Sequence, residues 1–170
     1  MYPPCSGVTF PCQNQTASDG EGPAMTENTR PSVRVLLVDD FEAFRRFICS
    51  TLKKNRELQV VGEASDGLEA IQKAEHLQPD LIILDIGLPT LNGIEAAKRI
   101  HRVIPTAKIL FLTQNNDTDV IRAALSNGAK GYVLKVDANR QLLHAVEAVL
   151  QGGRFISVSV NHPDRRPSLG

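Results

Sequence analysis

The sequence lacks the long apolar runs, the charge excess and the cysteine framework that would each indicate a particular class of protein. No apolar stretch approaches the roughly 20 residues that cross a bilayer, and the amino terminus has neither the cationic start nor the apolar segment of a secretory signal. Nineteen Lys and Arg residues balance nineteen Asp and Glu residues, so no overall field attracts nucleic acid or anionic lipid. The three cysteines show no CxxC spacing, and we expect free thiols in a cytoplasmic protein.

The composition is that of one globular domain with unstructured ends. A chain of 170 residues with 42% hydrophobic residues is long enough for a single core. Residues 1–32 are rich in Pro, Gly, Ser and Thr without an apolar period, which predicts a disordered extension. Met25 opens a short polar lead into the first strand, and we expect it to be the natural start. Residues 154–170 predict a flexible tail or a truncated linker.

Between these ends, short apolar runs alternate five times with helical periods. We expect strands at residues 33–38, 58–61, 81–84, 108–112 and 132–134, with an amphipathic helix after each. Pro79 stops the second helix, Asn92 caps the third, Asn127 and Gly128 close the fourth, and Gly152 and Gly153 close the fifth. Five strand–helix units in succession predict a parallel sheet with right-handed crossovers and helices on both faces.

The most informative stretch is LIILDIGLP, residues 81–89, an unbroken apolar run that ends in Asp85. Such a run is typical of a strand buried on both faces of a parallel sheet. In open parallel sheets, ligands bind outside the carboxyl ends of the strands, so an acid at this position is placed for chemistry. The alternative is a turn-forming or helix-capping Asp before Gly87 and Pro89.

Four strand ends carry polar or charged side chains, which belong to Asp39 and Asp40, Asp85, Thr113 and Lys135. Because these ends share one edge of the sheet, we expect three carboxylates, a hydroxyl and an ammonium in a single cleft. Packed carboxylates repel unless a cation lies among them, and Mg²⁺ suits an oxygen ligand set. Asp85 is then the best-placed nucleophile for a phosphoryl group, because carboxylates form aspartyl-phosphate intermediates.

Ordinary structural roles remain open for the acid pair and for Lys135. Asp39 and Asp40 are also compatible with a turn, and Lys135 with a solvated loop position. The histidines show no metal-ligand spacing and are expected at the surface.

The motifs VRVLLVDD, LIILDIGLP, NGIEAAKRI, ILFLT and AKGYVLK, in this order, resemble the receiver domain of bacterial two-component response regulators. The resemblance covers about residues 33–153. It implies an α/β flavodoxin-like fold of five strand–helix units in three layers, with strand order 2-1-3-4-5. It also implies Mg²⁺ dependence and phosphotransfer from a sensor histidine kinase.

Matched by position, each site residue acquires a role in this resemblance. Asp85 is the phosphoacceptor, Asp39 and Asp40 are the acid pair with Asp40 favoured as the direct metal ligand, and Gly87 is a ligand through its backbone carbonyl. Thr113 is the switch hydroxyl and Lys135 the phosphate contact. Tyr132 is the switch aromatic, although an aromatic in a strand is also ordinary core. Gln114 and Val136 depart from the common pattern, and Gln114 is expected to crowd the phosphate.

The expected output is a change of the face formed by the fourth helix, fifth strand and fifth helix. This face is a candidate surface for homodimerisation. The GGRFIS sequence resembles the receiver end of the subfamily that continues into a LuxR/NarL-type helix-turn-helix domain, which is missing here. DNA binding is expected only through that missing domain. Two alternatives are a truncated transcription factor and a stand-alone receiver that docks to partners.

A small phosphohydrolase or flavin protein on the same fold is a rival hypothesis of a different class. A nucleotide or flavin site needs a Gly-rich phosphate loop after the first strand, where this chain has Asp39 and Asp40. An Asp-x-Asp nucleophile loop is also absent, because Gly87 stands two residues after Asp85. We therefore expect a signalling switch and not an enzyme.

Overall fold

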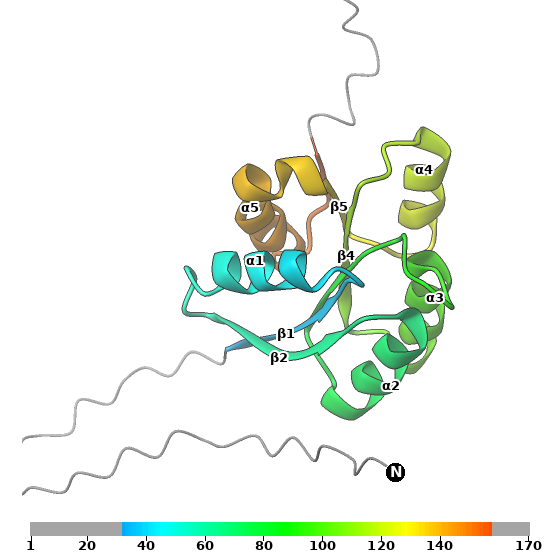
Figure 1. Cartoon of the computed structure of the whole chain (residues 1–170), viewed down its shortest axis with the longest axis horizontal. Coiled ribbons are helices and arrows are strands. Elements are labelled where there is room, and N and C mark those ends of the chain that lie inside the picture. The colour runs from blue at the N-terminus through cyan, green and yellow to red at the C-terminus, as the bar shows by residue number, and fades with distance from the viewer. Residues whose placement is uncertain (1–31, 158–170) are drawn as a thin grey trace, which may run out of the picture.

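The computed structural model describes residues 32–157, which form a three-layer α/β domain (Figure 1). The expectations for the amino-terminal extension, for Met25 as the start and for residues 158–170 lie outside the described residues. None of the described helices has the length and apolar character needed to span a bilayer.

The described sheet has six parallel strands in the order β2-β1-β3-β4-β5-β6. The strands are β1 (Val33–Val38), β2 (Leu58–Ala64), β3 (Leu81–Leu84), β4 (Lys108–Thr113), β5 (Gly131–Leu134) and β6 (Phe155–Ile156). All four residues of β3 are buried, as its apolar sequence predicts. β3 pairs with β1 on one side and with β4 on the other, so Asp85 leaves the sheet near its centre.

Within residues 32–157, five α-helices connect or follow these strands. They are α1 (Glu42–Leu52), α2 (Gly67–Leu77), α3 (Gly93–Val103), α4 (Thr118–Ser126) and α5 (Ala138–Leu150), and a short 3-10 turn, η1 (Lys135–Asp137), precedes α5. Asn92 caps α3 by accepting the Glu95 N–H, as predicted. Gly128 and Gly152 follow α4 and α5 with φ of 91° and 87°, a region that glycine enters without strain.

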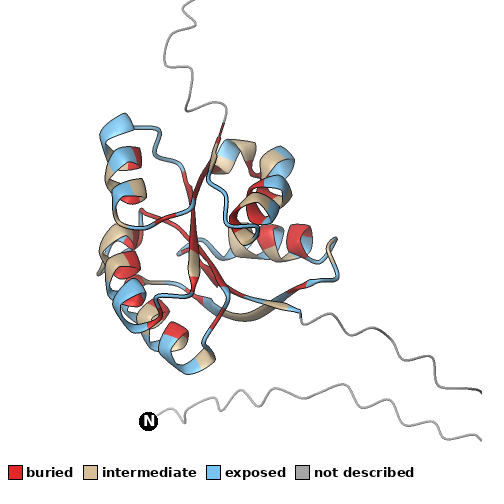
Figure 2. Cartoon of the chain, turned by 180° about the vertical axis from the view of Figure 1, so that it is seen from behind, coloured by how far each residue is buried: buried red, intermediate tan, exposed pale blue. Residues whose placement is uncertain are grey.

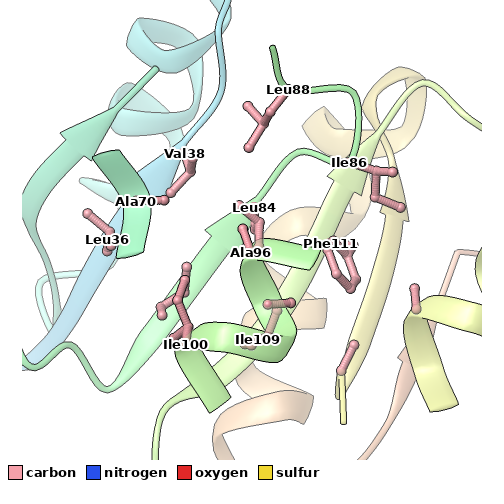
Figure 3. Close-up of a cluster of buried hydrophobic side chains, with 14 of the residues drawn as sticks. Leu36, Val38, Ala70, Leu84, Ile86, Leu88, Ala96, Ile100, Ile109 and Phe111 are labelled. Carbon is pink, nitrogen blue, oxygen red and sulfur yellow. The ribbon is translucent and has the colours of Figure 1, made fainter. Parts of the chain in front are cut away.

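Two apolar layers lie on opposite faces of the sheet (Figure 2). Leu36, Leu84 and Phe111 point to the face covered by α2, α3 and α4 (Figure 3). Their strand neighbours Leu37 and Ile83 point to the face covered by α1 and α5. This alternation follows from the two-residue period of a strand. It makes each central strand apolar on both faces and leaves chemistry to the strand ends.

The sixth strand differs from the expected five-stranded sheet. After the turn at Gly152, Phe155 and Ile156 run parallel to β5, with Phe155 opposite Gly131 and Ile156 opposite Tyr132. The Phe155 N–H donates to the Lys130 carbonyl at 3.0 Å. The first half of β5 therefore pairs with a strand from the segment that composition predicted to be a tail. Sequence patterns did not predict this strand, because it has only two residues and follows Gly152 and Gly153.

Candidate functional site

The site is formed where four strands end at one edge of the sheet. Asp39 directly follows β1 and Asp85 directly follows β3, while Thr113 ends β4 and Lys135 follows β5. Asp40, Asp85, Thr113 and Lys135 line one cleft of about 400 Å³, together with Phe41, Ile86, Gly87, Gln114 and Asn115. The structure therefore brings the predicted strand-end residues together.

Lys135 is the centre of this arrangement. Its Nζ lies 2.6 Å from Asp39 Oδ2 and 2.8 Å from Asp85 Oδ2, and its side chain is only 9% exposed. The ring of Phe44, in the first turn of α1, lies 4.8 Å from the same Nζ. The ammonium is thus enclosed by two carboxylates and an aromatic face. We name Asp39, Phe44, Asp85 and Lys135 the Lys135 cluster.

Burial and charge oppose each other within this cluster. Burial raises the pKa of the Asp39 carboxyl, and the hydrogen bonds from Lys135 and from the Phe41 N–H only partly offset this effect. Burial alone would lower the pKa of Lys135, but the hydrogen bonds to Asp39 and Asp85 outweigh it and hold that pKa above its usual range. Lys135 therefore stays charged between the two carboxylates.

A third carboxylate joins this group from the β1–α1 loop. One carboxylate oxygen each of Asp39, Asp40 and Asp85 lies within 4.8 Å of the others, and Asp40 is the exposed member. Three carboxylates facing one ammonium leave an excess of negative charge, which a hard divalent cation relieves. The donor chemistry fits Mg²⁺. Gly87 lines the same cleft, and its N–H donates to Asp85 Oδ1 at 3.1 Å.

Thr113 and Tyr132 hold the segment of residues 114–117, which we name the β4–α4 segment. The Thr113 hydroxyl oxygen accepts the Asn115 N–H at 3.2 Å, and the Tyr132 hydroxyl donates to the Asn115 carbonyl. The Tyr132 side chain is completely buried. Burial, followed by the charges of Asp117 and Asp85, raises its pKa to about 12, so the hydroxyl remains a donor at neutral pH.

Comparison with known proteins identifies the family to which this site belongs. Residues 35–147 match the family model described as the response regulator receiver domain. The chain belongs to this family. It is 34% identical over 130 residues to the transcriptional regulatory protein DegU of Brevibacillus brevis, across 76% of this chain and 55% of that protein. The receiver chain thus spans about half the length of this curated relative.

Solved structures support the same assignment of the fold. The receiver chain superposes with a TM-score of 0.73 and 32% identity on a LuxR-family two-component response regulator from Aurantimonas sp. SI85-9A1, covering 76% of this chain and 93% of that one. The isolated receiver domain of RcsB from Salmonella enterica serovar Typhimurium was solved in the presence of the phosphomimetic BeF3−. It superposes with a TM-score of 0.72 and 30% identity, covering 76% of this chain and 96% of that one. The predicted α/β receiver fold is confirmed, with β6 added.

Sequence reasoning missed several residues that shape this receiver site. Arg45 donates from its guanidinium to the Asp39 carbonyl at 2.7 Å and to Glu63 at 3.0 Å, which ties the β1–α1 loop to β2. A Cβ on Gly93 would lie 2.0 Å from the Asp85 carbonyl oxygen, so only glycine fits there. Arg45 and Phe44 looked like ordinary helix positions, and no local pattern indicated their contacts.

Proposed function

We propose that this receiver domain is a phosphorylation-dependent signalling switch with Asp85 as the phosphoacceptor. The observation that carries the proposal is the junction of Asp85, Asp39 and Lys135 at distances of 2.6 and 2.8 Å inside the acid cluster. The proposed donor is a sensor histidine kinase. In the transfer, an Asp85 carboxylate oxygen forms a bond to phosphorus while the bond from phosphorus to the imidazole nitrogen breaks. The imidazole takes the electron pair.

Each residue of the cleft has a part in the proposed transfer. Asp39, Asp40, Asp85 and the carbonyl of Gly87 would hold Mg²⁺, which neutralises phosphoryl oxygens when bound. Lys135 would donate to one phosphoryl oxygen as it leaves Asp85 Oδ2. Thr113 would donate its hydroxyl hydrogen to another, since its oxygen already accepts from Asn115. The acidic cluster supports this metal assignment.

The proposed response begins at the β4–α4 segment. Phosphorylation replaces the single negative charge of Asp85 with a charge of about −1.5 to −2. The added phosphoryl oxygens would attract the Thr113 hydroxyl. This movement would shift the β4–α4 segment, which Tyr132 also contacts. A shift between two states from 1:99 to 99:1 requires about 5.5 kcal/mol of differential binding. The face of α4, β5 and α5 would change with this segment. Tyr132 is the proposed switch aromatic.

Homodimerisation through this face is part of the proposal. Because β6 pairs with Gly131 and Tyr132 at the edge of β5, we expect the contact to use the outer surfaces of α4 and α5 instead of strand pairing. Size-exclusion chromatography with and without BeF3− and Mg²⁺ tests this point, and equal elution in both contradicts it. The name of the relative DegU, a transcriptional regulatory protein, supports a transcriptional output. Docking of a stand-alone receiver to a partner protein is the alternative.

We propose that the switch comprises residues 33–153, as the sequence predicts, together with β6, which pairs with β5. A kinase that uses ATP would place the exchange in the cytoplasm. The proposed role is a switch, not an enzyme that turns over a substrate.

Phosphoryl transfer to Asp85 can be tested directly by intact mass. The wild type, incubated with Mg²⁺ and acetyl phosphate, should gain one phosphoryl group, and Asp85→Asn should gain none. Asp119→Asn is the matched control, because Asp119 is an exposed acid on α4 that lies outside the acid cluster. A phosphoryl increment on Asp85→Asn equal to that on the wild type would refute the assignment.

A further inference from the structure

We propose that Phe44 is a positioning residue for the phosphoryl-transfer site, which holds the Lys135 ammonium in line with Asp85 through a cation–π contact. The inference rests on the proposed function. The Lys135 Nζ lies 4.8 Å from the centroid of the Phe44 ring and within 2.8 Å of both Asp39 and Asp85. Aromatic faces attract ammonium groups at this range, most strongly where water is excluded.

The Phe44 ring also has apolar contacts within its own layer of the domain. Phe44 packs against the apolar layer of α1 and α5, and the Phe47 ring lies 5.7 Å from it at a 35° tilt. The Phe44 N–H donates to the Phe41 carbonyl at 3.1 Å, which starts α1 directly after the acid pair. The same turn of chain therefore carries two of the three clustered carboxylates and the ring that faces Lys135.

A ring serves this position better than a hydrogen-bond acceptor would. During transfer the Lys135 ammonium has to exchange a carboxylate oxygen for a phosphoryl oxygen. A π face attracts the cation without fixing the direction of any N–H, so the ammonium can rotate while it stays in place. A carboxylate or amide there would compete with the phosphoryl group for the same N–H donors.

The ring also covers part of the Lys135 side chain where it borders a second cleft. Phe44 lines a cleft of about 500 Å³ together with Phe41, Leu134, Lys135 and Val136. Without the ring, this cleft would admit water to the ammonium, and a solvated ammonium binds a phosphoryl oxygen more weakly. Phe44 thus acts through Lys135 and not on the reacting atoms.

Three single variants test the role of the ring against simple packing. The measured quantity is the rate of phosphoryl gain by intact mass with acetyl phosphate and Mg²⁺. Phe44→Leu keeps an apolar side chain without a π face and should lower the rate about 3- to 30-fold. Phe44→Tyr keeps the aromatic face and should stay within about twofold. Phe47→Leu removes a ring from the same helix that contacts Phe44 and should also stay within about twofold.

A double-mutant cycle separates positioning from packing. In a Lys135→Gln background, Phe44→Leu should lower the rate by less than about twofold, because the cation is gone. An equal loss in both backgrounds, or a loss in Phe44→Tyr as large as in Phe44→Leu, overturns the proposal. Urea unfolding of each variant identifies any that fails to fold. If the wild type gains no phosphoryl group, the proposed function fails instead.

Discussion

The carboxyl edge of the sheet has two unlike halves. In the Lys135 cluster, carboxylates that are 3% and 7% exposed bind one ammonium, and a ring covers it. In the β4–α4 segment, all four residues are exposed, and the Tyr132 and Thr113 hydroxyls hold Asn115. The helices that follow Lys135 and the β4–α4 segment also differ in how many residues they bury. α5 buries Ala138, Leu142, Ala145, Val146 and Val149, whereas α4 buries only Ile121 and Ala124.

This difference determines which region would change conformation when the charge at Asp85 changes. Regions with few buried apolar contacts and exposed backbone open at low free energy, while packed regions open only with the whole domain. The Lys135 cluster is therefore the fixed half, and the β4–α4 segment with α4 is the half that can shift. The predictions below perturb the fixed half first and the movable half second, in order of decreasing effect within each half.

Removing the Lys135 ammonium should lower the free energy of unfolding more than any other substitution considered below. We expect Lys135→Met to lower the free energy of unfolding by about 3 kcal/mol in EDTA, because Asp39 and Asp85 stay buried without their cation. Millimolar Mg²⁺ should restore part of this loss. Urea unfolding with EDTA and with Mg²⁺ measures both effects, and Lys130→Met, at an exposed lysine, is the control. A loss below about 0.5 kcal/mol in EDTA would contradict the prediction.

Crowding the backbone of Asp85 should have the next largest effect in the fixed half. We expect Gly93→Ala to cost about 2 kcal/mol, because the added Cβ would lie 2.0 Å from the Asp85 carbonyl oxygen. Gly87→Ala is the matched control. Its Cβ would lie 3.9 Å from the Asp85 carboxylate and should change stability by less than about 0.5 kcal/mol. Equal unfolding midpoints for the two variants would show that α3 does not fix the end of β3.

Gly93 also marks the limit of what the sequence could predict. The convergence of Asp39, Asp85, Thr113 and Lys135 was predictable, because the carboxyl ends of parallel strands share one edge. The close approach of Gly93 to Asp85 was not, because it depends on how α3 meets β3 in three dimensions. The Phe44–Lys135 contact joins residues 91 positions apart in the sequence (135 minus 44) and has no local pattern. The two-residue strand β6 was too short to leave a period.

In the movable half, alkaline pH should weaken the anchor of the β4–α4 segment. The pKa of Tyr132 rises from 10.0 to about 12 through burial and the charges of Asp117 and Asp85. Because the folded-state pKa lies above the unfolded value, this contribution to stability is complete below pH 10 and is lost as the pH rises through 12. Two pKa units correspond to a loss of about 3 kcal/mol. The raised pKa of Lys135 adds a loss of the same sign, so the effect of Tyr132 is measured as the difference between wild type and Tyr132→Phe.

At neutral pH, Tyr132→Phe should have the smallest effect on stability, and the effect should be confined to the β4–α4 segment. Tyr132→Phe keeps the buried ring and removes the hydrogen bond to the Asn115 carbonyl, which water can replace because Asn115 is exposed. We expect a loss of about 1 kcal/mol at pH 7. Hydrogen exchange should accelerate at the amides of Asn115 and Asp117 but not at those of Phe41 and Gly87, which donate to Asp39 and Asp85. Above pH 10 the variant should lose less stability than the wild type, because no phenol ionises at this position. Equal acceleration in both sets of amides would show that the two halves open as one unit, and the division into a fixed and a movable half would then fail.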